Sequence, residues 1–209
     1  MNIWTQRLKA GLCALCLAAA FLTPALASSY TDVADDAWYA SAVESMRTQG
    51  IMQGTGGGTF SPDLITDRAT VVTVLWKIAG SPAAAETGQI FSDVPTDRWY
   101  AQAVAWAYEL GITTGTDKGE FRPADQITRE QLAVFFYRYD LSLGHETASG
   151  ILDLYVDADQ VSSWAVDGMR HAIGAGIVEG SDYQLSPQAT ATRAELAVML
   201  DRVLTPAAG

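Results

Sequence analysis

Apolar residues recur at helical spacing in several separate stretches of the chain, and turn-forming residues lie between them. In the stretch from residue 99 to residue 110, one helical face carries Trp99, Ala103, Val104, Ala107 and Leu110. Stretches 71–80, 132–141 and 196–204 are more continuously apolar. We therefore predict an all-α protein in which these three helices form a central three-helix bundle and the amphipathic helices lie outside.

The same landmarks occur three times in the same order. Each copy opens at a tryptophan, and a Gly-Ile pair follows twelve residues later, with another glycine four residues beyond the first. The tryptophans are Trp38, Trp99 and Trp164, and the second glycines are Gly54, Gly115 and Gly180. A proline then precedes an arginine by six residues, and these arginines are Arg68, Arg129 and Arg193. This periodicity predicts three helix-loop-helix repeats.

Residues that begin and end helices lie at equivalent positions in the copies. An N-cap residue type lies two positions before each tryptophan, at Asp36, Asp97 and Ser162. The first glycines, which favour a left-handed helix end, are Gly50, Gly111 and Gly176. The second helices are predicted to begin at the arginines, because residues 128–131 and 192–195 fit a capping box and Asp67 supplies a cap without the reciprocal acid.

The first 27 residues are predicted to be a secretory signal peptide. Arg7 and Lys9 precede an apolar run at 10–22 that is too short to span a bilayer, and 25–27 form a small-residue cleavage pattern. A retained membrane anchor is the alternative. The predicted boundaries of the other segments are repeats at 28–80, 90–143 and 154–204, linkers at 81–89 and 144–153, and a tail at 205–209.

Composition narrows the classes of partner. Both cysteines, Cys13 and Cys16, lie in the predicted leader, so the exported part has no disulfide and depends on packing. The leader holds two of the 13 basic residues and none of the 24 acidic ones, which leaves a net charge of −13. This charge argues against nucleic acid and against an anionic membrane surface as partners. An anionic ligand would have to be bound by a local cationic pocket.

The three arginines are the candidate ligand-binding residues. An arginine in a first helical turn presents a fork of donors beside free backbone N–H groups, which suits a carboxylate. Three arginines in one register of an acidic chain favour this function over solvated side chains. Trp38, Trp99 and Trp164 are predicted to pack in the core or in an interface in preference to stacking on sugars.

The sequence carries no recognisable catalytic or metal-binding constellation. His145 and His171 lie far apart without a shared motif, and no nucleophile motif is present. Residues 153–159 hold three aspartates but resemble a calcium loop only loosely. We therefore expect no enzyme activity, no metal and no cofactor.

Residues 29–204 resemble three tandem S-layer homology (SLH) repeats. The resemblance rests on F-S-D-V at 91–94, with near matches at 30–33 and 155–158. It also rests on T-R-A-E at 192–195, T-R-E-Q at 128–131 and D-R-A-T at 67–70. The resemblance implies a pseudo-threefold arrangement of repeats. It also implies binding of a peptidoglycan-linked secondary cell-wall polymer, often with a pyruvate ketal, in grooves between adjacent repeats.

The resemblance carries over the family's ligand contacts to particular positions of this chain. The arginine of the T-R-A-E motif is the main ligand contact, which implies this role for Arg68, Arg129 and Arg193. The tryptophan and glycine-loop positions line the grooves, which implies that role for Trp38, Trp99, Trp164, Gly54, Gly115 and Gly180. Asp67 departs from the pattern and adds a negative charge beside Arg68, so the first repeat's groove is an open question.

The leading expectation is therefore an exported, cell-wall-associated protein that holds an anionic glycan without catalysing a reaction. One groove would bind weakly to moderately, and several grooves on one polymer would gain from effective concentration. The alternative is an exported structural or interaction protein that binds another envelope protein.

Overall fold

The computed structural model describes residues 30–85 and 88–205, and within these ranges the regular elements are helical. The predicted leader at 1–27 and most of the predicted tail lie outside the described residues. The α-helices are α1 (Ala40–Thr48), α2 (Arg68–Ile78), α3 (Ala101–Glu109), α4 (Arg129–Ser142), α5 (Val166–Gly174) and α6 (Arg193–Leu204). The short 3-10 helices are η1 (Leu152–Leu154), η2 (Ala158–Gln160) and η3 (Ser163–Ala165). The predicted all-α class is confirmed.

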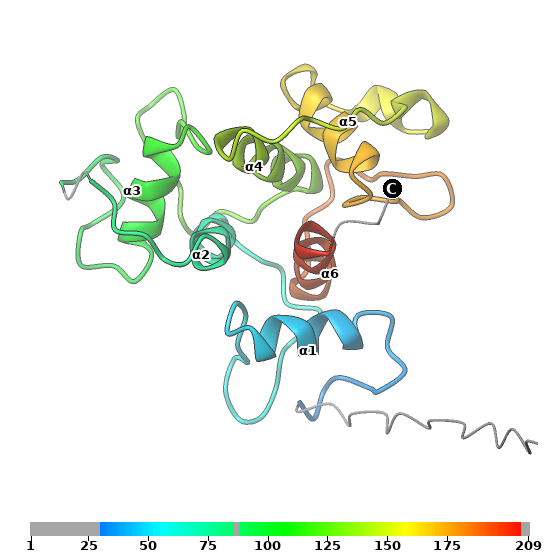
Figure 1. Ribbon diagram of the computed structural model, residues 1–209, viewed down its shortest axis with the longest axis horizontal. Coiled ribbons are helices and arrows are strands. Elements are labelled where there is room, and N and C mark those ends of the chain that lie inside the picture. The colour runs from blue at the N-terminus through cyan, green and yellow to red at the C-terminus, as the bar shows by residue number, and fades with distance from the viewer. Residues whose placement is uncertain (1–29, 86–87, 206–209) are drawn as a thin grey trace, which may run out of the picture.

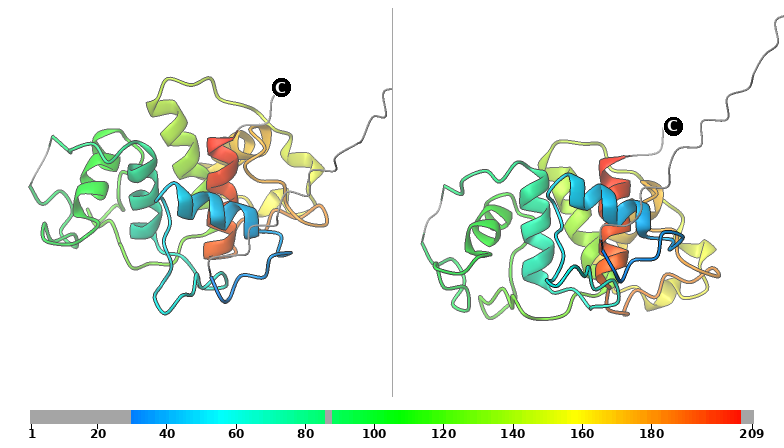
Figure 2. Two further views of the ribbon diagram at one scale, coloured as in Figure 1. Left: turned by 60° about the horizontal axis from the view of Figure 1, so that its bottom comes forward. Right: turned by 90° about the horizontal axis from the view of Figure 1, so that it is seen from below.

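The second helix of each repeat lies in the middle of the molecule. Figure 1 looks down α2, α4 and α6, which are seen end-on, while α1, α3 and α5 lie around them. In the side views of Figure 2 the three central helices run along one common direction. Their apolar side chains are buried, among them Leu75, Leu132 and Leu196, each with no exposed surface. None of the described helices is long and apolar enough to cross a bilayer.

Each outer helix packs on the central helix of a different repeat. Helix α3 packs on α2, α5 packs on α4, and α1 packs on α6. Figure 1 shows the last contact, with α1 below α6, so that the first repeat meets the third. The three repeats are therefore joined in a closed ring.

A ring of backbone hydrogen bonds joins the segments that precede the central helices. The N–H of Thr66 donates to the carbonyl of Ala191 (2.9 Å), and the N–H of Ala191 donates to the carbonyl of Ile127 (3.0 Å). The N–H of Ile127 in turn donates to the carbonyl of Thr66 (3.2 Å). Each repeat thus gives one bond and receives one. The pseudo-threefold symmetry itself stays a prediction.

The predicted starts of the central helices are confirmed. Helices α2, α4 and α6 begin at Arg68, Arg129 and Arg193. Thr128 with Gln131, and Thr192 with Glu195, form capping boxes, and the carboxylate of Asp67 accepts from the N–H of Thr70 (2.7 Å). The outer helices also end as expected, at glycines with left-handed φ angles, Gly50 (71°), Gly111 (70°) and Gly176 (70°).

The predicted starts of α1 and α3 are wrong, because their N-cap residues are Tyr39 and Tyr100 and neither makes a side-chain cap bond. In the third repeat Ser162 is the N-cap residue of η3, which leads directly into α5, but its side chain makes no cap bond. Asp36 and Asp97 instead lie in turns that precede the helices, because the N–H groups of Ala40 and Ala101 still bond three residues back. Ser162 gives both its backbone N–H and its hydroxyl to the buried carboxylate of Glu130 (2.9 and 2.8 Å).

The apolar face predicted for residues 99–110 is correct only in its middle. Ala103, Val104 and Ala107 are buried, whereas Trp99 and Leu110 lie beyond the two ends of α3 and are exposed. The buried part of the face is therefore shorter than the apolar pattern suggests.

Candidate ligand-binding grooves

Each of the three candidate arginines reaches across to another repeat. The Nε–H of Arg68 donates to the carbonyl of Phe121 (2.8 Å), that of Arg129 to Leu185 (2.7 Å), and that of Arg193 to Phe60 (2.9 Å). All three side chains are half-buried. These arginines are therefore held in place at the contacts between repeats.

Aromatic rings support two of the guanidinium groups. Arg68 lies over the rings of Phe121 and Phe135, at 4.9 and 5.4 Å from their centroids. Arg193 lies 4.6 Å from the centroid of Phe60. Burial lowers the pKa of Arg68 and of Arg193, although Asp125 and Asp93 partly offset this effect at Arg68, and Tyr30 and Asp32 do so at Arg193. Arginine nevertheless stays protonated in proteins, so both groups keep their charge.

An aspartate in each repeat fixes the loop that offers the acceptor carbonyl. The carboxylate of Asp32 accepts from the N–H groups of Phe60 (2.8 Å) and Ser61 (2.7 Å). Asp93 and Asp157 make the equivalent bonds in the other two repeats. In the sequence these aspartates belong to the segments that carry the family resemblance, and Asp157 also belongs to the loose calcium-loop pattern, but their role in holding the loops was not predicted. The sequence pattern that could have identified this role is the constant separation of 28 residues between each aspartate and the loop residue that it binds.

The aspartate bonds hold a loop residue in a left-handed conformation. The residue between the aromatic or leucine position and the proline has a positive φ in every repeat, 59° at Ser61, 59° at Arg122 and 50° at Ser186. This conformation is unfavourable for residues other than glycine. Each left-handed residue donates its N–H to the aspartate of its own repeat, which offsets part of that cost.

The loop glycines are required by close packing against an aromatic ring. A Cβ atom at Gly54 would lie 2.7 Å from a ring carbon of Tyr30, and one at Gly180 would lie 2.9 Å from a ring carbon of Tyr155. Gly115 is packed in the same way beneath Phe91. These glycines therefore let the loop lie against the aromatic residue near the start of its repeat.

The three repeat tryptophans are on the surface, and the prediction that they pack in the core or an interface is wrong. Trp38, Trp99 and Trp164 are 66%, 63% and 57% exposed. Each precedes the start of its α-helix, so it lies beyond the buried face that the helix presents. Trp38 and Trp99 pack edge-to-face on Tyr39 and Tyr100. Exposed indoles of this kind offer a flat apolar face to a ligand.

The first groove, called the Trp38 groove here, combines residues of all three repeats. It has a volume of about 530 Å³. Trp38 comes from the first repeat and Arg129 from the second, and the remaining lining comes from the third. The polar and loop residues of that lining include Glu179, Gly180, Ser181, Gln184, Glu195 and Arg202.

The second groove, the Trp99 groove, is built from the equivalent parts one repeat along. It has a volume of about 190 Å³. Trp99 comes from the second repeat, Arg193 from the third, and the rest from the first. The first repeat contributes Ile51, Met52, Gln53, Thr70, Thr73, Val74 and Lys77. Arg68 and Trp164 line neither of these two grooves.

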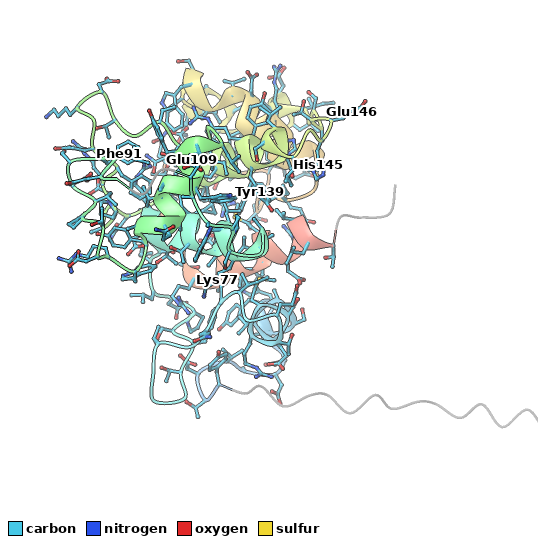
Figure 3. The ribbon with its side chains drawn as sticks, turned by 60° about the vertical axis from the view of Figure 1, so that its left-hand side comes forward. Lys77, Phe91, Glu109, Tyr139, His145 and Glu146 are labelled. Carbon is cyan, nitrogen blue, oxygen red and sulfur yellow. The ribbon has the colours of Figure 1, made fainter. Side chains whose placement is uncertain are left out.

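A second basic residue accompanies the arginine in each repeat, and sequence analysis missed it. Lys77, Arg138 and Arg202 all lie nine residues after the arginine that begins the helix. Each donates to the carbonyl of the isoleucine that follows the outer helix, at 3.3, 3.4 and 3.2 Å. Figure 3 shows Lys77, on α2, between the central helices and the outer part of the first repeat. Their constant position, nine residues after the first arginine of each central helix, is the sequence pattern that could have identified them.

The two histidines, expected to lie far apart, meet at one carboxylate. Asp140 lies 2.9 Å from Nε2 of the buried His171 and 3.3 Å from Nδ1 of the exposed His145. Burial would raise the pKa of Asp140, but hydrogen bonds with His171 and His145 lower it below its ordinary value. Among the described residues, no group of three His, Cys, Asp or Glu side chains is placed to hold a metal ion.

Comparison with known proteins identifies one family and several relatives. A family model described as the S-layer homology domain matches residues 29–72, 90–133 and 154–197. A surface-layer 125 kDa protein of Lysinibacillus sphaericus is 30% identical over 90% of this chain and 16% of its own length. An exoglucanase of Acetivibrio thermocellus is 29% identical over 82% of the chain and 16% of its own length. A cellulosome-anchoring protein of that species is 27% identical over 73% of the chain and 35% of its own length.

Proposed function

The chain belongs to the S-layer homology domain family, and on this premise we propose that it binds an anionic cell-wall glycan non-covalently through its inter-repeat grooves. The family and its surface-layer relatives indicate a location at the cell surface. Anchoring to the wall is the function that this family supports. The glycan's carboxylate, for example on a pyruvate ketal, is the finer part of our proposal.

The observation that carries the proposal is the recurrence of one set of side chains in two grooves. In each groove an exposed tryptophan, a half-buried arginine and a second basic residue come from different repeats. A sugar ring can stack on an indole, and a guanidinium can bind a carboxylate with two parallel hydrogen bonds. This combination suits a saccharide that carries an acidic substituent.

Two grooves on one chain suit a repeating polymer. A charge-assisted hydrogen bond contributes about 1.5–3 kcal/mol, so a single groove would bind only weakly. When one groove is occupied, the next ligand unit on the same polymer is already at high effective concentration. Attachment through several weak contacts is thus strong overall without a covalent bond.

We propose no enzyme activity for this chain. The exoglucanase relative is matched over 16% of its length, so its name describes a protein much larger than the region that it shares with this chain. The chain likewise spans 16% of the surface-layer relative. Anchoring of a larger protein is a function that relatives with such different names can have in common.

Sedimentation with purified cell-wall sacculi tests the proposal. Replacing Trp38 and Trp99 together by alanine should lower the bound fraction at least tenfold, because the indole faces that meet the sugar are removed. Both side chains are largely exposed, so the variant should stay folded. Tyr183→Ala is the matched control, since Tyr183 is 75% exposed and lines neither groove.

The outcome separates the two candidate functions. Undiminished sedimentation of the double variant would refute binding through these grooves. Removal of ketal groups from the sacculi should abolish binding if the carboxylate is the recognised group. Retention on envelope extract after digestion of the wall polymer would instead favour a protein partner.

A further inference from the structure

The third repeat exposes apolar side chains at two positions that are polar or glycine in the other repeats. In every repeat, the N–H of the residue after the opening aromatic residue donates to a carbonyl in the glycine loop. The donor and acceptor residues are Thr31 and Gly58, Ser92 and Gly119, and Val156 and Tyr183. Val156 is 72% exposed and Tyr183 is 75% exposed. They are the two most exposed large apolar side chains in the part of the chain that the structure describes.

Tyr183 also has a backbone conformation that suits glycine. Its φ angle is 60°, and those of Gly58 and Gly119 at the equivalent positions are 79° and 70°. This left-handed region is unfavourable for a bulky residue, whereas glycine adopts it freely. Within the described ranges, the side chain of Tyr183 makes no hydrogen bond and no ring contact. The fold therefore gains little from a strained tyrosine here, which indicates a function for its side chain.

A cavity of about 490 Å³ lies beside Val156, between the start of the third repeat and α5. At the equivalent place in the second repeat, between Phe91 and the start of α3, the cavity has only about 20 Å³. In Figure 1 the 3-10 helices of this segment, drawn in yellow, lie at the outer edge of the molecule. The apolar and charged residues that line the larger cavity include Leu152, Tyr155, Val166, Asp153, Asp159 and Arg170.

The charged residues of this cavity are available to a ligand. Asp153, Asp159 and Arg170 take part in none of the ion pairs among the described residues. The lining therefore carries one more negative than positive charge. Asp182, which precedes Tyr183, is also exposed. A basic group on a ligand would be attracted to these carboxylates.

The chemistry of this surface fits a polypeptide better than a sugar or a second copy of the chain. The aliphatic side chains of Ile151 and Leu154, 60% and 63% exposed, continue the apolar surface in the segment before Val156. Sugars stack on flat aromatic rings, and aliphatic side chains do not offer such a face. A second copy would place the same aspartates opposite Asp153 and Asp159, which costs electrostatic repulsion.

We propose that this surface docks a segment of another exported protein that presents aliphatic side chains beside a lysine or arginine. The surface, called the Tyr183 surface, consists of Ile151, Asp153, Leu154, Val156, Asp159 and Tyr183. Aliphatic side chains of the partner would cover the apolar residues, and its basic side chain would reach the aspartates. The inference goes beyond wall binding, because none of these residues lines the Trp38 groove or the Trp99 groove.

Titration with defined peptides, followed by 1H–15N NMR of the backbone amides, tests the inference. The probe is the peptide Ac-Leu-Lys-Leu-Lys-Leu-NH2, which combines both chemistries. One control peptide has glutamate in place of lysine, and the other has glycine in place of leucine. The probe should shift the amides of 151–159 and of Tyr183 saturably, with a Kd about tenfold or more below that of either control.

Two double variants should remove this binding. Val156→Thr with Tyr183→Gly introduces the residues of the first repeat, Thr31 and Gly58, and should raise the Kd for the probe about tenfold or more. Asp153→Asn with Asp159→Asn should do the same by removing the carboxylates. The matched control is Leu110→Thr with Asp117→Asn, which changes an exposed apolar and an exposed acidic residue of the second repeat. The control should leave the Kd unchanged.

Tyr183→Gly alone distinguishes a binding role from a structural one. Glycine relieves the left-handed backbone strain, so the variant should unfold at a higher urea concentration than the unaltered protein. Its Kd for the probe should nevertheless rise, because the exposed ring is lost. A tyrosine that supported the fold would instead give a lower urea midpoint on replacement.

Several outcomes would overturn the inference. No saturable response, equal Kd values for the three peptides, shifts spread over the other acidic parts of the surface, or a lower urea midpoint for Tyr183→Gly would each do so. Saturable shifts of the same amides with methyl β-D-glucopyranoside would assign the surface to a sugar instead. A dimer that Tyr183→Gly abolishes in analytical ultracentrifugation would assign it to a second copy. Sacculus sedimentation of Tyr183→Gly should be unchanged, so the wall-binding proposal is tested separately.

Discussion

In each repeat an aspartate, a loop carbonyl and an arginine from another repeat form one continuous set of hydrogen bonds. In the first repeat, Asp32 holds the N–H groups of Phe60 and Ser61, and the carbonyl of Phe60 accepts from Arg193. The loop that Asp32 holds is thus the one that positions the Nε–H of Arg193. At the scale of single residues, the binding group and the structural group are therefore directly connected.

Asp32→Asn tests this connection through stability and its pH dependence. Burial would raise the pKa of Asp32, but the two backbone hydrogen bonds and the charge of Arg193 lower it below its ordinary value. A depressed folded-state pKa gives stability that is present above the unfolded pKa of about 3.9 and is lost as the pH falls through the folded pKa. The variant should lose about 1–3 kcal/mol at pH 7 and less on further acidification.

Urea unfolding at pH 7 and at pH 3 measures both effects. Asp36→Asn is the matched control, because Asp36 is exposed and caps no helix. The control should stay within about 0.5 kcal/mol of the unaltered protein. A loss for Asp32→Asn that is the same at both pH values would contradict the role of the ionised carboxylate.

The positions of these residues were predictable, but their surroundings were not. Regular spacing identified Arg68, Arg129 and Arg193 because a register is visible in one dimension. The exposure of Trp99 depends on where α3 begins, and the observed N-cap, Tyr100, lies three residues after the predicted one, Asp97, so that the indole precedes the helix and is exposed. The pairing of Arg129 with Glu195 joins residues 66 positions apart, which no local pattern reveals.

Among the helices, those with strong local signals were predicted best. Capping boxes and left-handed glycines act within a few residues, so the starts of α4 and α6 and the end of α1 follow directly from the sequence. No side chain caps the outer helices, so no local signal in the sequence marks where α1, α3 and α5 begin. Their starts could not be read from sequence for that reason.

The contact between α4 and α5 depends on the absence of a side chain at Gly168. A Cβ atom there would lie 2.7 Å from Cγ2 and 2.9 Å from Cα of Val134. Gly168→Ala should therefore cost about 1–3 kcal/mol, despite a helix-propensity gain of about 1 kcal/mol. Urea unfolding would measure the loss. Adding Val134→Ala should recover part of it, and a more stable Gly168→Ala variant would show that α5 does not approach so closely.

Over the whole molecule, the three repeats exchange packing partners. The sequence indicated three similar units, and the same landmarks would fit units that each pack on themselves. In the structure α1 packs on α6, α3 on α2 and α5 on α4. Periodicity alone does not distinguish these arrangements, because both bury the same apolar faces.

Truncation before residue 192, which removes α6, should unfold far more than the third repeat. Helix α1 would lose its packing partner, and the backbone ring would be weakened at Ala191. We expect loss of the cooperative urea transition and of dispersed NMR signals from the first repeat as well. Folded first and second repeats in the truncated chain would instead indicate an open array of the solenoid type.

Closure of the ring also sets how many units can assemble. The contact between α1 and α6 uses the faces that the first and third repeats would otherwise present to further copies. A fourth unit added to the same chain would thus find no vacant partner and would have to start a separate assembly. Longer arrays of such units should accordingly be organised in multiples of three.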